Sequence, residues 1–548
     1  MLSILAARAG AGHVYCVEMS QALCEVAKEC IQANGCEEKV SLVHAHSSDL
    51  QPHHMSHGPP QVLVTELVDS GLFGEHIVSV LSDARRLLAK EAIVIPHSAS
   101  LWAQLIQSDD IQHRKEYRDA HKQLVATAEE VYTCDNLLNL DHTPLSAPFL
   151  VAEVVFEEVG ARSGPLIFSH NCHVTVSGRV DAVVTWFDLH LTDPRDPDPI
   201  SISTEPGRPS CGWDQAIHFV HGMQVELGSD IECRFLLENE VLSVALSAQP
   251  LDLSQIRLGE MDIAALNDTQ WWREFENAAI TAHSAFPESV VIESTSRWRS
   301  VIMSGAIPCE GVCLTSTEPC SQILTNIAVD SHSRITISHS SILEHCAQRQ
   351  DLSSRSFILI CDIIEGSGLI RQRVLQDIAY SLLFLQNVGR IIPFAFEVHV
   401  SLFESEETCS RYVVSGANTA GVNLQSINSY MSSRICELEL GSSAFRQLSD
   451  VAKVRIELSE LKNANDVVLE QIVTLRVDNP GAVHLIGFWF SLELNNCHSL
   501  SLWAKEDPAA HCRQAGFMVE GFHVNAADEL EVVVTVSLSY GVHCMIKR

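Results

Sequence analysis

The sequence contains an internal repeat, and its two copies lie about 300 residues apart in the chain. In each copy an apolar run leads to an acidic residue, Glu66 in the first and Asp362 in the second. A Gly-Leu pair and an Ile-Pro pair follow in both copies, and a Trp-Phe pair and a Gln-Ala pair come later in the same order. These matches, in one order and at nearly one offset, predict two tandem modules, which can pack as an internal pseudo-dimer within a monomer.

Within each module, the apolar pattern changes from one type of sheet to another. In the first copy, short apolar runs alternate with amphipathic helical spacing, which predicts a parallel, doubly wound, Rossmann-like sheet. Short alternating strands follow and predict an antiparallel sandwich or barrel. The predicted fold class is therefore α/β plus β, repeated in tandem. The expected domains are a Rossmann-like domain at 1–98, a β-barrel domain at 99–250 with a helical arm at about 104–145, a linker at 251–290, a second Rossmann-like domain at 291–400 and a second β-barrel at 401–548.

Composition excludes several classes of protein. The chain has 36 Lys and Arg against 69 Asp and Glu, so its net charge of −33 argues against sequence-independent nucleic-acid binding and favours a cationic partner. No apolar run is long and uncharged enough to predict a membrane span, and the first residues lack a signal leader. The 18 Cys include no C-x-x-C pair, so we expect no metal site and a reducing compartment, the cytoplasm or also the nucleus.

Polar residues follow the predicted strands where an open α/β sheet binds its ligands. Glu18 ends the strand at 14–17, where an acidic side chain can accept hydrogen bonds from ribose hydroxyls; the alternative is an ordinary surface glutamate. Ser47, Ser48 and Asp49 follow the next strand, where the base of a nucleotide would lie. A helix cap or turn explains those three residues equally well.

The strand at 62–64 leads into a loop with two glutamates, Glu66 and Glu75, around glycines. Two carboxylates that converge on one pocket form a fork for a planar guanidinium, which they can bind through bidentate hydrogen bonds. The alternative is a solvated loop whose two acids act independently.

The segment Thr65 to Glu75 resembles the double-glutamate loop of the protein arginine methyltransferases. Residues 2–11, 14–20 and 86–96 are similar to other parts of that family's nucleotide domain, and the tandem copies resemble its tandem members. The resemblance implies S-adenosyl-L-methionine as cofactor, bound by Glu18 and residues 47–49, with Glu66 and Glu75 as catalytic residues. It also implies an Arg-rich protein acceptor, with a splicing factor as one candidate, and monomethyl and symmetric dimethylarginine as products.

A third family element resembles the segment Cys211-Gly212-Trp213, which stands where family members have Thr-His-Trp in the wall of the arginine pocket. Trp213 could stack on the guanidinium of the substrate, and the alternative is a core tryptophan. The His of the family motif is absent here. By resemblance, therefore, the position of the target nitrogen is less well defined.

Two departures from the family pattern limit the expected activity. Met1 falls within the family's first motif helix, so we expect a fragment, a shortened isoform or an incomplete gene model. Such a chain lacks the preceding strand and glycine-rich loop, and we expect it to bind the cofactor weakly. In the second copy, Asp362 and Gln372 replace the glutamates and Arg371 and Arg373 lie beside them, although Glu318 still matches Glu18. We expect that copy to be non-catalytic. Two other hypotheses are a catalytically silent scaffold and a small-molecule methyltransferase.

Overall fold

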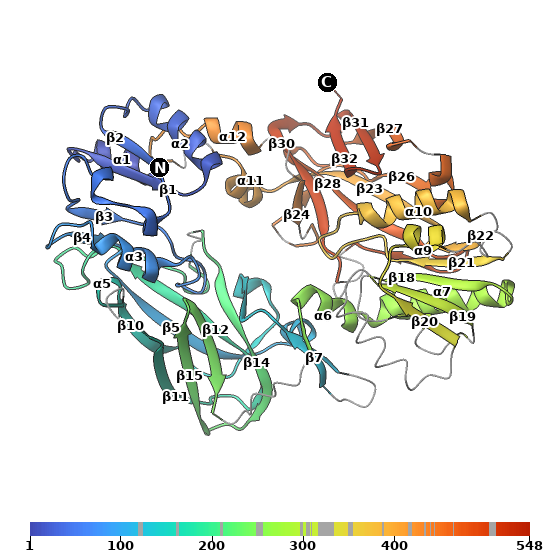
Figure 1. Ribbon diagram of the computed structural model, residues 1–548, viewed down its shortest axis with the longest axis horizontal. Coiled ribbons are helices and arrows are strands. Elements are labelled where there is room, and N and C mark those ends of the chain that lie inside the picture. Colours follow the sequence, from blue (N-terminus) through green and yellow to red (C-terminus); the bar gives the residue numbers. More distant parts are fainter. Residues whose placement is uncertain are drawn as a thin grey trace. The chain divides into compact units, whose positions relative to one another are not determined.

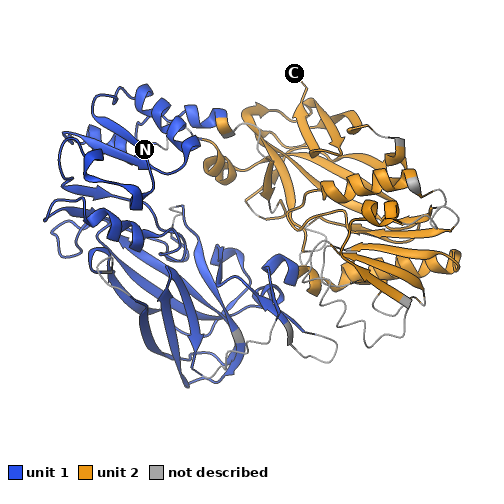
Figure 2. Cartoon of the chain, viewed as in Figure 1, with its two compact units in different colours: residues 1–263, 414–429 blue, residues 264–413, 430–548 orange. Residues whose placement is uncertain are grey.

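The computed structural model divides the chain into two compact units, which are coloured separately in Figure 2. Unit 1 is Met1–Ile263 with Val414–Ser429, and unit 2 is Ala264–Val413 with Tyr430–Arg548. The structure describes residues 1–118, 124–159, 164–208, 212–247, 256–295, 300–302, 307, 309–315, 334–348, 355–385, 388–414, 419–431, 435–438, 440–442, 444–463, 465–503 and 511–547.

The first hundred residues of unit 1 form two pairs of parallel strands with intervening helices (Figure 1). The elements are α1 (Leu2–Arg8), β1 (Val14–Glu18), α2 (Gln21–Ala33), β2 (Val40–His44), η1 (Ser47–Asp49), η2 (Pro52–His54), β3 (Val62–Val64), α3 (Ile77–Arg85) and β4 (Ile93–Ile95). β1 pairs with β2, and β3 pairs with β4. Ser20 begins α2 as its N-cap, with its hydroxyl oxygen accepting from the Leu23 N–H at 3.4 Å. The predicted alternation of helices and parallel strands is confirmed.

The rest of unit 1 is largely antiparallel sheet. Its elements are β5 (Ser98–Gln107), α4 (Asp109–Lys115), β6 (Glu116–Arg118), β7 (Leu124–Ala128), β8 (Tyr132–Asp135), η3 (Leu137–Asn139), β9 (Thr143–Pro144), β10 (Phe149–Val155), α5 (Phe156–Val159), β11 (Leu166–His173), β12 (Gly178–His190), β13 (Ser201–Ser203), β14 (Gln215–Val225), β15 (Asp230–Glu238), β16 (Val241–Leu246) and β17 (Ile256–Leu258). A seven-stranded sheet has the order β10-β5-β12-β14-β8, with β13 on β12 and β9 on β5. The three-stranded sheet β11-β15-β16 contributes to the same hydrophobic core.

The prediction of a helical arm at 104–145 is wrong. Among the residues described in that range, only Asp109–Lys115 forms an α-helix, and strands β6, β7 and β8 occupy much of the rest. β7 pairs with β17, which lies more than a hundred residues further along the chain. Such non-local pairing overrides the local polar pattern from which the helix was predicted.

Unit 2 contains a parallel sheet followed by antiparallel sheets. α6 (Glu260–Asn267) crosses the boundary between the units, and the elements after it are α7 (Thr269–Ala285), β18 (Val290–Thr295), β19 (Glu310–Thr315), β20 (Arg334–Ser338), α9 (Ile342–Gln348), β21 (Phe357–Cys361), α10 (Gln372–Phe384), β22 (Val388–Ile392), β23 (Ala395–Glu404), α11 (Glu406–Tyr412), α12 (Ser426–Met431), β24 (Ile435–Leu438), β25 (Arg446–Gln447), β26 (Ala452–Glu457), η6 (Leu458–Asn463), β27 (Val467–Arg476), β28 (Gly481–Glu493), β29 (Ser499–Ser501), β30 (Gln514–Val524), β31 (Glu529–Ser537) and β32 (Gly541–Ile546). The parallel sheet has the order β20-β19-β18-β21-β22, and the larger antiparallel sheet has the order β24-β30-β28-β23-β25.

The predicted linker at 251–290 is also wrong over the residues that the structure describes. Most of them form α6 and α7, and the buried side of α7 belongs to the core of unit 2. The apolar residues of α7 recur at helical spacing: Trp271, Trp272, Phe275, Ala278, Ala279 and Ala282. Because polar residues lie between them, the composition of the segment alone does not indicate this apolar stripe.

The antiparallel strands of the two units match, whereas their parallel sheets differ. β5 and β23 each have 10 residues, β12 and β28 each have 13, and β14 and β30 each have 11. In unit 2, β18 joins β19 to β21 and completes a five-stranded sheet. Among the described residues of unit 1, no strand joins β1 to β3.

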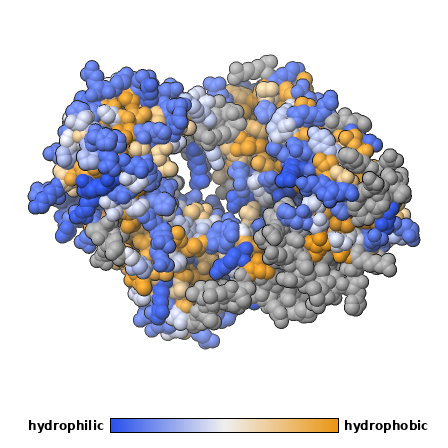
Figure 3. Space-filling view, in the orientation of Figure 1, coloured by the Kyte–Doolittle hydropathy of each residue, from blue (hydrophilic) through white to orange (hydrophobic). Residues whose placement is uncertain are grey.

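The burial of matching strands reflects this difference. All five residues of β21 are buried, whereas Val62 and Val64 of β3 are exposed. Figure 3 shows apolar patches among the hydrophilic residues on the visible face of unit 1. In the described part of the chain, no helix is long and apolar enough to cross a membrane.

A distant segment, residues 414–429, completes the core around α1 and α2. Val422 and Leu424 are buried there against Ile4, Ala7 and Ile31. The side-chain amide of Asn34 joins the segment to α2, because its oxygen accepts from the Asn423 N–H at 2.9 Å and its nitrogen donates to the Asn423 carbonyl at 2.8 Å.

We predict that Asn34→Ala destabilises this core by about 1–3 kcal/mol, because the substitution leaves several polar partners unpaired. Hydrogen exchange should rise in residues 419–429, and the unfolding temperature should fall. Gln32→Ala is a matched control on the same helix, since Gln32 is exposed. Equal behaviour of the two variants would show that Asn34 does not hold the segment.

Candidate active site

The loop between β3 and α3 presents both glutamates at its surface while burying its centre. The Thr65 N–H donates to the Ile95 carbonyl at 2.9 Å, which continues the β3–β4 pairing up to Glu66. Leu72 and Phe73 are buried with 0% and 1% of their surface exposed, whereas Glu66 and Glu75 are exposed. The buried pair anchors the loop and leaves the two carboxylates available for a ligand.

Glu75 is close enough to Glu66 for its negative charge to act on the Glu66 carboxylate. Partial burial raises the pKa of Glu66 above its ordinary value, and the negative charge of Glu75 raises it further. The structure therefore brings the two predicted residues together. A cation between them would relieve this repulsion, which is the electrostatic property required of a guanidinium fork.

Side chains from the antiparallel sheet hold the loop in place. The Tyr132 hydroxyl donates to the Asp69 carboxylate, and the other oxygen of Asp69 accepts from the Gly74 N–H at 2.9 Å. A Cβ atom at Gly71 would lie 2.6 Å from the Tyr132 ring, so this position requires glycine. Tyr132 and Asp69 were not predicted as site residues. Asp69 lies within the motif, but Tyr132 lies in the stretch that was predicted as a helix.

Burial keeps the aromatic residues behind the loop uncharged. It raises the pKa of Tyr132, and its hydrogen bond to Asp69 raises it further, so the phenol remains a donor. Complete burial lowers the pKa of His218 to about 3. The neutral His218 ring lies 5.1 Å from the Tyr132 ring and hydrogen-bonds to the Thr185 hydroxyl at 2.9 Å.

Trp213 also contacts the loop. Its indole N–H donates to the Val68 carbonyl at 2.8 Å, and its ring packs edge-on against Phe187, 5.8 Å between centroids. It is partly buried at the edge of the core, so it holds the loop from behind. Stacking on a bound guanidinium stays a prediction. Cys211, which precedes it in the matched segment, lies outside the described residues.

The predicted cofactor residues lie at the carboxyl ends of neighbouring parallel strands. Glu18 ends β1 and accepts from the Ser20 N–H at 2.7 Å through Oε1. Ser47, Ser48 and Asp49 form the short 3₁₀ turn η1 after β2. The Ser47 hydroxyl donates to Asp83 of α3 at 3.1 Å, so this hydroxyl already has a partner within the protein. The predicted turn is therefore present, and contact with a base stays a prediction.

The second copy differs at the corresponding loop. Arg371 forms an ion pair with Asp362, with 3.4 Å between Nε and Oδ2, and Asp362 is buried. Gln372 is the first residue of α10. An internal arginine therefore engages the carboxylate that corresponds to Glu66. Glu318 lies outside the residues that the structure describes.

Several known proteins similar to this chain are arginine methyltransferases. A family model described as the arginine methyltransferase oligomerization subdomain matches residues 97–253. Protein arginine N-methyltransferase 9 of Mus musculus is 25% identical, over 97% of this chain and 76% of its own length. Arginine N(omega)-methyltransferase of Streptomyces achromogenes subsp. streptozoticus is 30% identical, over 39% of this chain and 59% of its own. The solved structure of Arabidopsis thaliana protein arginine methyltransferase 10 covers 45% of this chain and 83% of its own, with 19% identity and a TM-score of 0.36.

The chain is thus similar to protein arginine methyltransferases, and the prediction of an enzyme of this class is confirmed. Over nearly its whole length it is similar to protein arginine N-methyltransferase 9, whose Xenopus laevis form is 24% identical over 95% of this chain and 75% of its own length.

We predict that Glu75→Gln lowers the pKa of Glu66 toward its ordinary value, because the substitution removes the neighbouring negative charge. NMR titration of ¹³C-labelled glutamate carboxyls measures this shift, with Glu91→Gln as the control at another exposed glutamate.

In the wild-type chain, the raised pKa of Glu66 also makes stability depend on pH. Its contribution to the folded state is fully present at a pH below the pKa that Glu66 has in the unfolded chain. That contribution is lost as the pH rises through the folded-state pKa. An unchanged Glu66 titration would show that the two carboxylates are not neighbours in solution.

Proposed function

We propose that this protein transfers methyl groups from S-adenosyl-L-methionine to guanidino nitrogens of arginine residues in a protein. The observation that carries the proposal is the pair of exposed, electrostatically coupled carboxylates of Glu66 and Glu75. They lie in a loop braced from behind by Tyr132 and Trp213. Arginine carries the planar cation with several N–H donors that such a pair binds best.

The two carboxylates bind the substrate and orient it. Each can accept hydrogen bonds from the guanidinium, and together they fix its plane so that one terminal nitrogen faces the methyl donor. Their charge also stabilises two cations, the sulfonium and the guanidinium, in one pocket. The rate enhancement arises mainly from this orientation and from the electrostatic field of the fixed carboxylates.

The reaction also releases a proton, which a glutamate can accept. Methylation forms one N–C bond and breaks one N–H bond, so a proton must leave the guanidino group. Glu66 holds protons more readily than an ordinary carboxylate because its pKa is raised. We propose that Glu66 receives this proton and passes it to solvent, to which its side chain is exposed.

The residues at the strand ends suit a nucleoside cofactor in part. Glu18 would hold the ribose hydroxyls of S-adenosylmethionine, and the turn at Ser47, Ser48 and Asp49 would lie beside the adenine. The Glu18 carboxylate is partly exposed, and the backbone N–H of Ser20 fixes one of its oxygens. The cofactor, when bound, supplies the methyl group as an electrophile.

The proposal also covers the duplication. We propose tandem copies of a Rossmann-like methyltransferase domain followed by a β-barrel, with the boundaries stated above corrected at 104–145 and 251–290. The equal lengths of matching strands support this arrangement. The second copy is non-catalytic in this proposal, supported by the Arg371–Asp362 ion pair. The chain would be a monomer with an internal pseudo-dimer.

The acceptor is proposed to be an Arg-rich protein, such as a splicing factor, in the cytoplasm or the nucleus. The net charge of −33 supports attraction of a basic partner. The products implied by the family resemblance are monomethylarginine and symmetric dimethylarginine. Mass spectrometry of a hydrolysed, methylated acceptor tests this, since asymmetric dimethylarginine would contradict it.

We predict that Glu66→Gln and Glu75→Gln each reduce methyl transfer by on the order of 10²-fold or more, because each removes one fixed charge from a site that binds two cations. Radiolabelled methyl transfer to an Arg-rich protein measures the loss, and circular dichroism verifies folding. Asp362→Asn in the second copy is the matched control and should retain activity. Full activity of both glutamate variants would remove the site assignment, and a large loss in Asp362→Asn would show a second working site.

We also predict that a strand between β1 and β3 is needed for tight binding of S-adenosylmethionine. Unit 2 has such a strand in β18, and the described part of unit 1 has none. The backbone edges of β1 and β3 stay unpaired without it, and a loop after the strand would offer N–H groups to the cofactor. Isothermal titration should show much tighter binding by a chain extended with that strand and a glycine-rich loop. Equal, tight binding by both chains would contradict the prediction.

A further inference from the structure

We propose that Glu240, in the β15–β16 hairpin, is a positioning residue that fixes Glu75 by holding the first turn of α3. Its role in catalysis rests on the proposed function, whereas its effect on the position of Glu75 does not. Nothing in the sequence pattern singles out Glu240, which lies 165 positions from Glu75 in the chain. The argument rests on the conformation of the turn, the contacts of the carboxylate and a cavity beside the helix.

The conformation of the turn is unfavourable for glutamate. Asn239 and Glu240 have φ angles of 49° and 65°, so both occupy the left-handed region between β15 and β16. Two-residue hairpins of this type favour Asn followed by Gly, because glycine adopts this conformation without steric conflict. The backbone therefore does not explain a glutamate here, and the explanation must lie in its side chain.

The side chain of Glu240 reaches the N-terminus of α3. Oε1 accepts from the Ser79 N–H at 2.7 Å, and Oε2 lies 3.2 Å from Nδ1 of His76. His76 precedes the helix but makes no side-chain cap of its own. The carboxylate therefore satisfies one of the N–H groups that the first turn leaves unpaired, at the end where the helix dipole favours negative charge.

This contact bears directly on Glu75, which immediately precedes His76. On the other side of Glu75, the Gly74 N–H donates to Asp69, which Tyr132 holds in turn. Glu75 thus lies between two fixed points, both supplied by the antiparallel sheet. Without the Glu240 contact, the His76 N–H still donates to the Phe73 carbonyl at 3.2 Å, but Glu75 loses the side-chain contact that fixes the turn after it.

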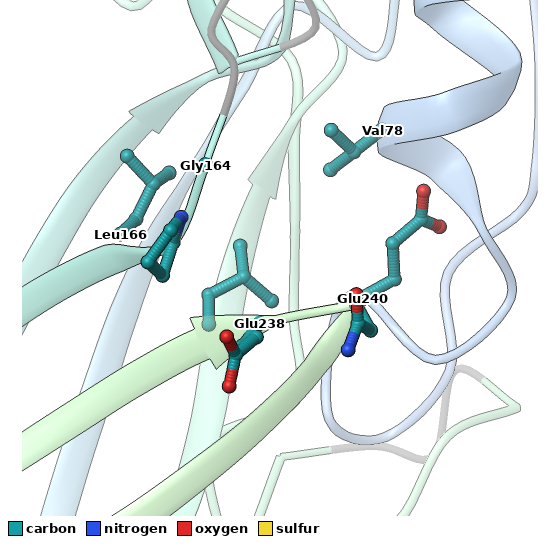
Figure 4. Close-up of a pocket in the computed structure, with 8 residues that line it drawn as sticks. Val78, Gly164, Leu166, Glu238 and Glu240 are labelled. Atoms are coloured by element: carbon teal, nitrogen blue, oxygen red, sulfur yellow. The ribbon is translucent and has the colours of Figure 1, made fainter.

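A cavity lies beside the first turn of α3. On that side, no packed side chain of the described residues replaces the contact that Glu240 makes with the turn. The cavity has a volume of about 330 Å³ and is lined by Val78, Leu166, Leu237 and Glu238 among others. In Figure 4, Val78 extends from α3 toward the cavity and the Glu240 carboxylate rises toward the helix, whereas Glu238 points away from it. Ile77, in the same turn, is fully buried.

The test uses Glu240→Gly, which removes the carboxylate and creates the favoured Asn-Gly turn, so the hairpin should remain folded. We expect hydrogen exchange at the amides of residues 76–80 to rise by about tenfold or more, as expected for the loss of a hydrogen bond to a charged acceptor. The pKa of Glu66 should move toward its ordinary value as Glu75 becomes mobile. Glu240→Gln retains an acceptor for Ser79 and should restore most of the protection.

The matched control is Ala527→Gly, which relieves another left-handed position, at φ 72°, between β30 and β31. It should change neither measurement. Unchanged exchange at 76–80 together with an unchanged Glu66 pKa in Glu240→Gly would overturn the proposal. Because both measurements use the chain without substrate, an active Glu66→Gln variant would remove the proposed function and leave this test intact.

Discussion

Two negative charges held side by side at the end of a strand require a rigid support, because each carboxylate repels the other. Partial burial raises the pKa of Glu66, and the negative charge of Glu75 raises it further. The support comes from the antiparallel sheet of the same unit, through Tyr132 on Asp69, Trp213 on the Val68 carbonyl and Glu240 on the first turn of α3. The parallel strands place the loop at the ligand-binding edge, and the antiparallel sheet fixes its shape. The position and the shape of the loop thus depend on both types of sheet in the unit.

The comparison of the two copies shows which features the site requires. Both loops follow a strand of a parallel sheet and contain a left-handed position, Leu72 in the first copy and Gly368 in the second. In the second copy, the carboxylate of Asp362 is already paired with Arg371 of the same loop. An internal cation satisfies the charge that a substrate would otherwise meet. This internal ion pair supports the proposal that the second copy is non-catalytic.

Much of this organisation could be predicted from sequence, because apolar periodicity and motif spacing are local. The strands around Val62–Val64 and the loop with both glutamates needed no long-range information. The residues that brace the loop could not be predicted in this way. Tyr132 lies in a strand that pairs with β14, and Glu240 is one polar residue in a turn. Their roles depend on which distant elements meet, and no local pattern encodes that.

The central claim is that Glu66 and Glu75 bind the guanidinium of an arginine side chain. The most direct measurement titrates Glu66 by NMR in the presence of an Arg-rich peptide and of the same peptide with citrulline in place of arginine. Citrulline keeps the planar shape but carries no charge. The account predicts that the arginine peptide lowers the pKa of Glu66, since a bound cation favours the carboxylate, and that the citrulline peptide does not. An equal effect of the two peptides, or no effect of the arginine peptide at saturation, would contradict it.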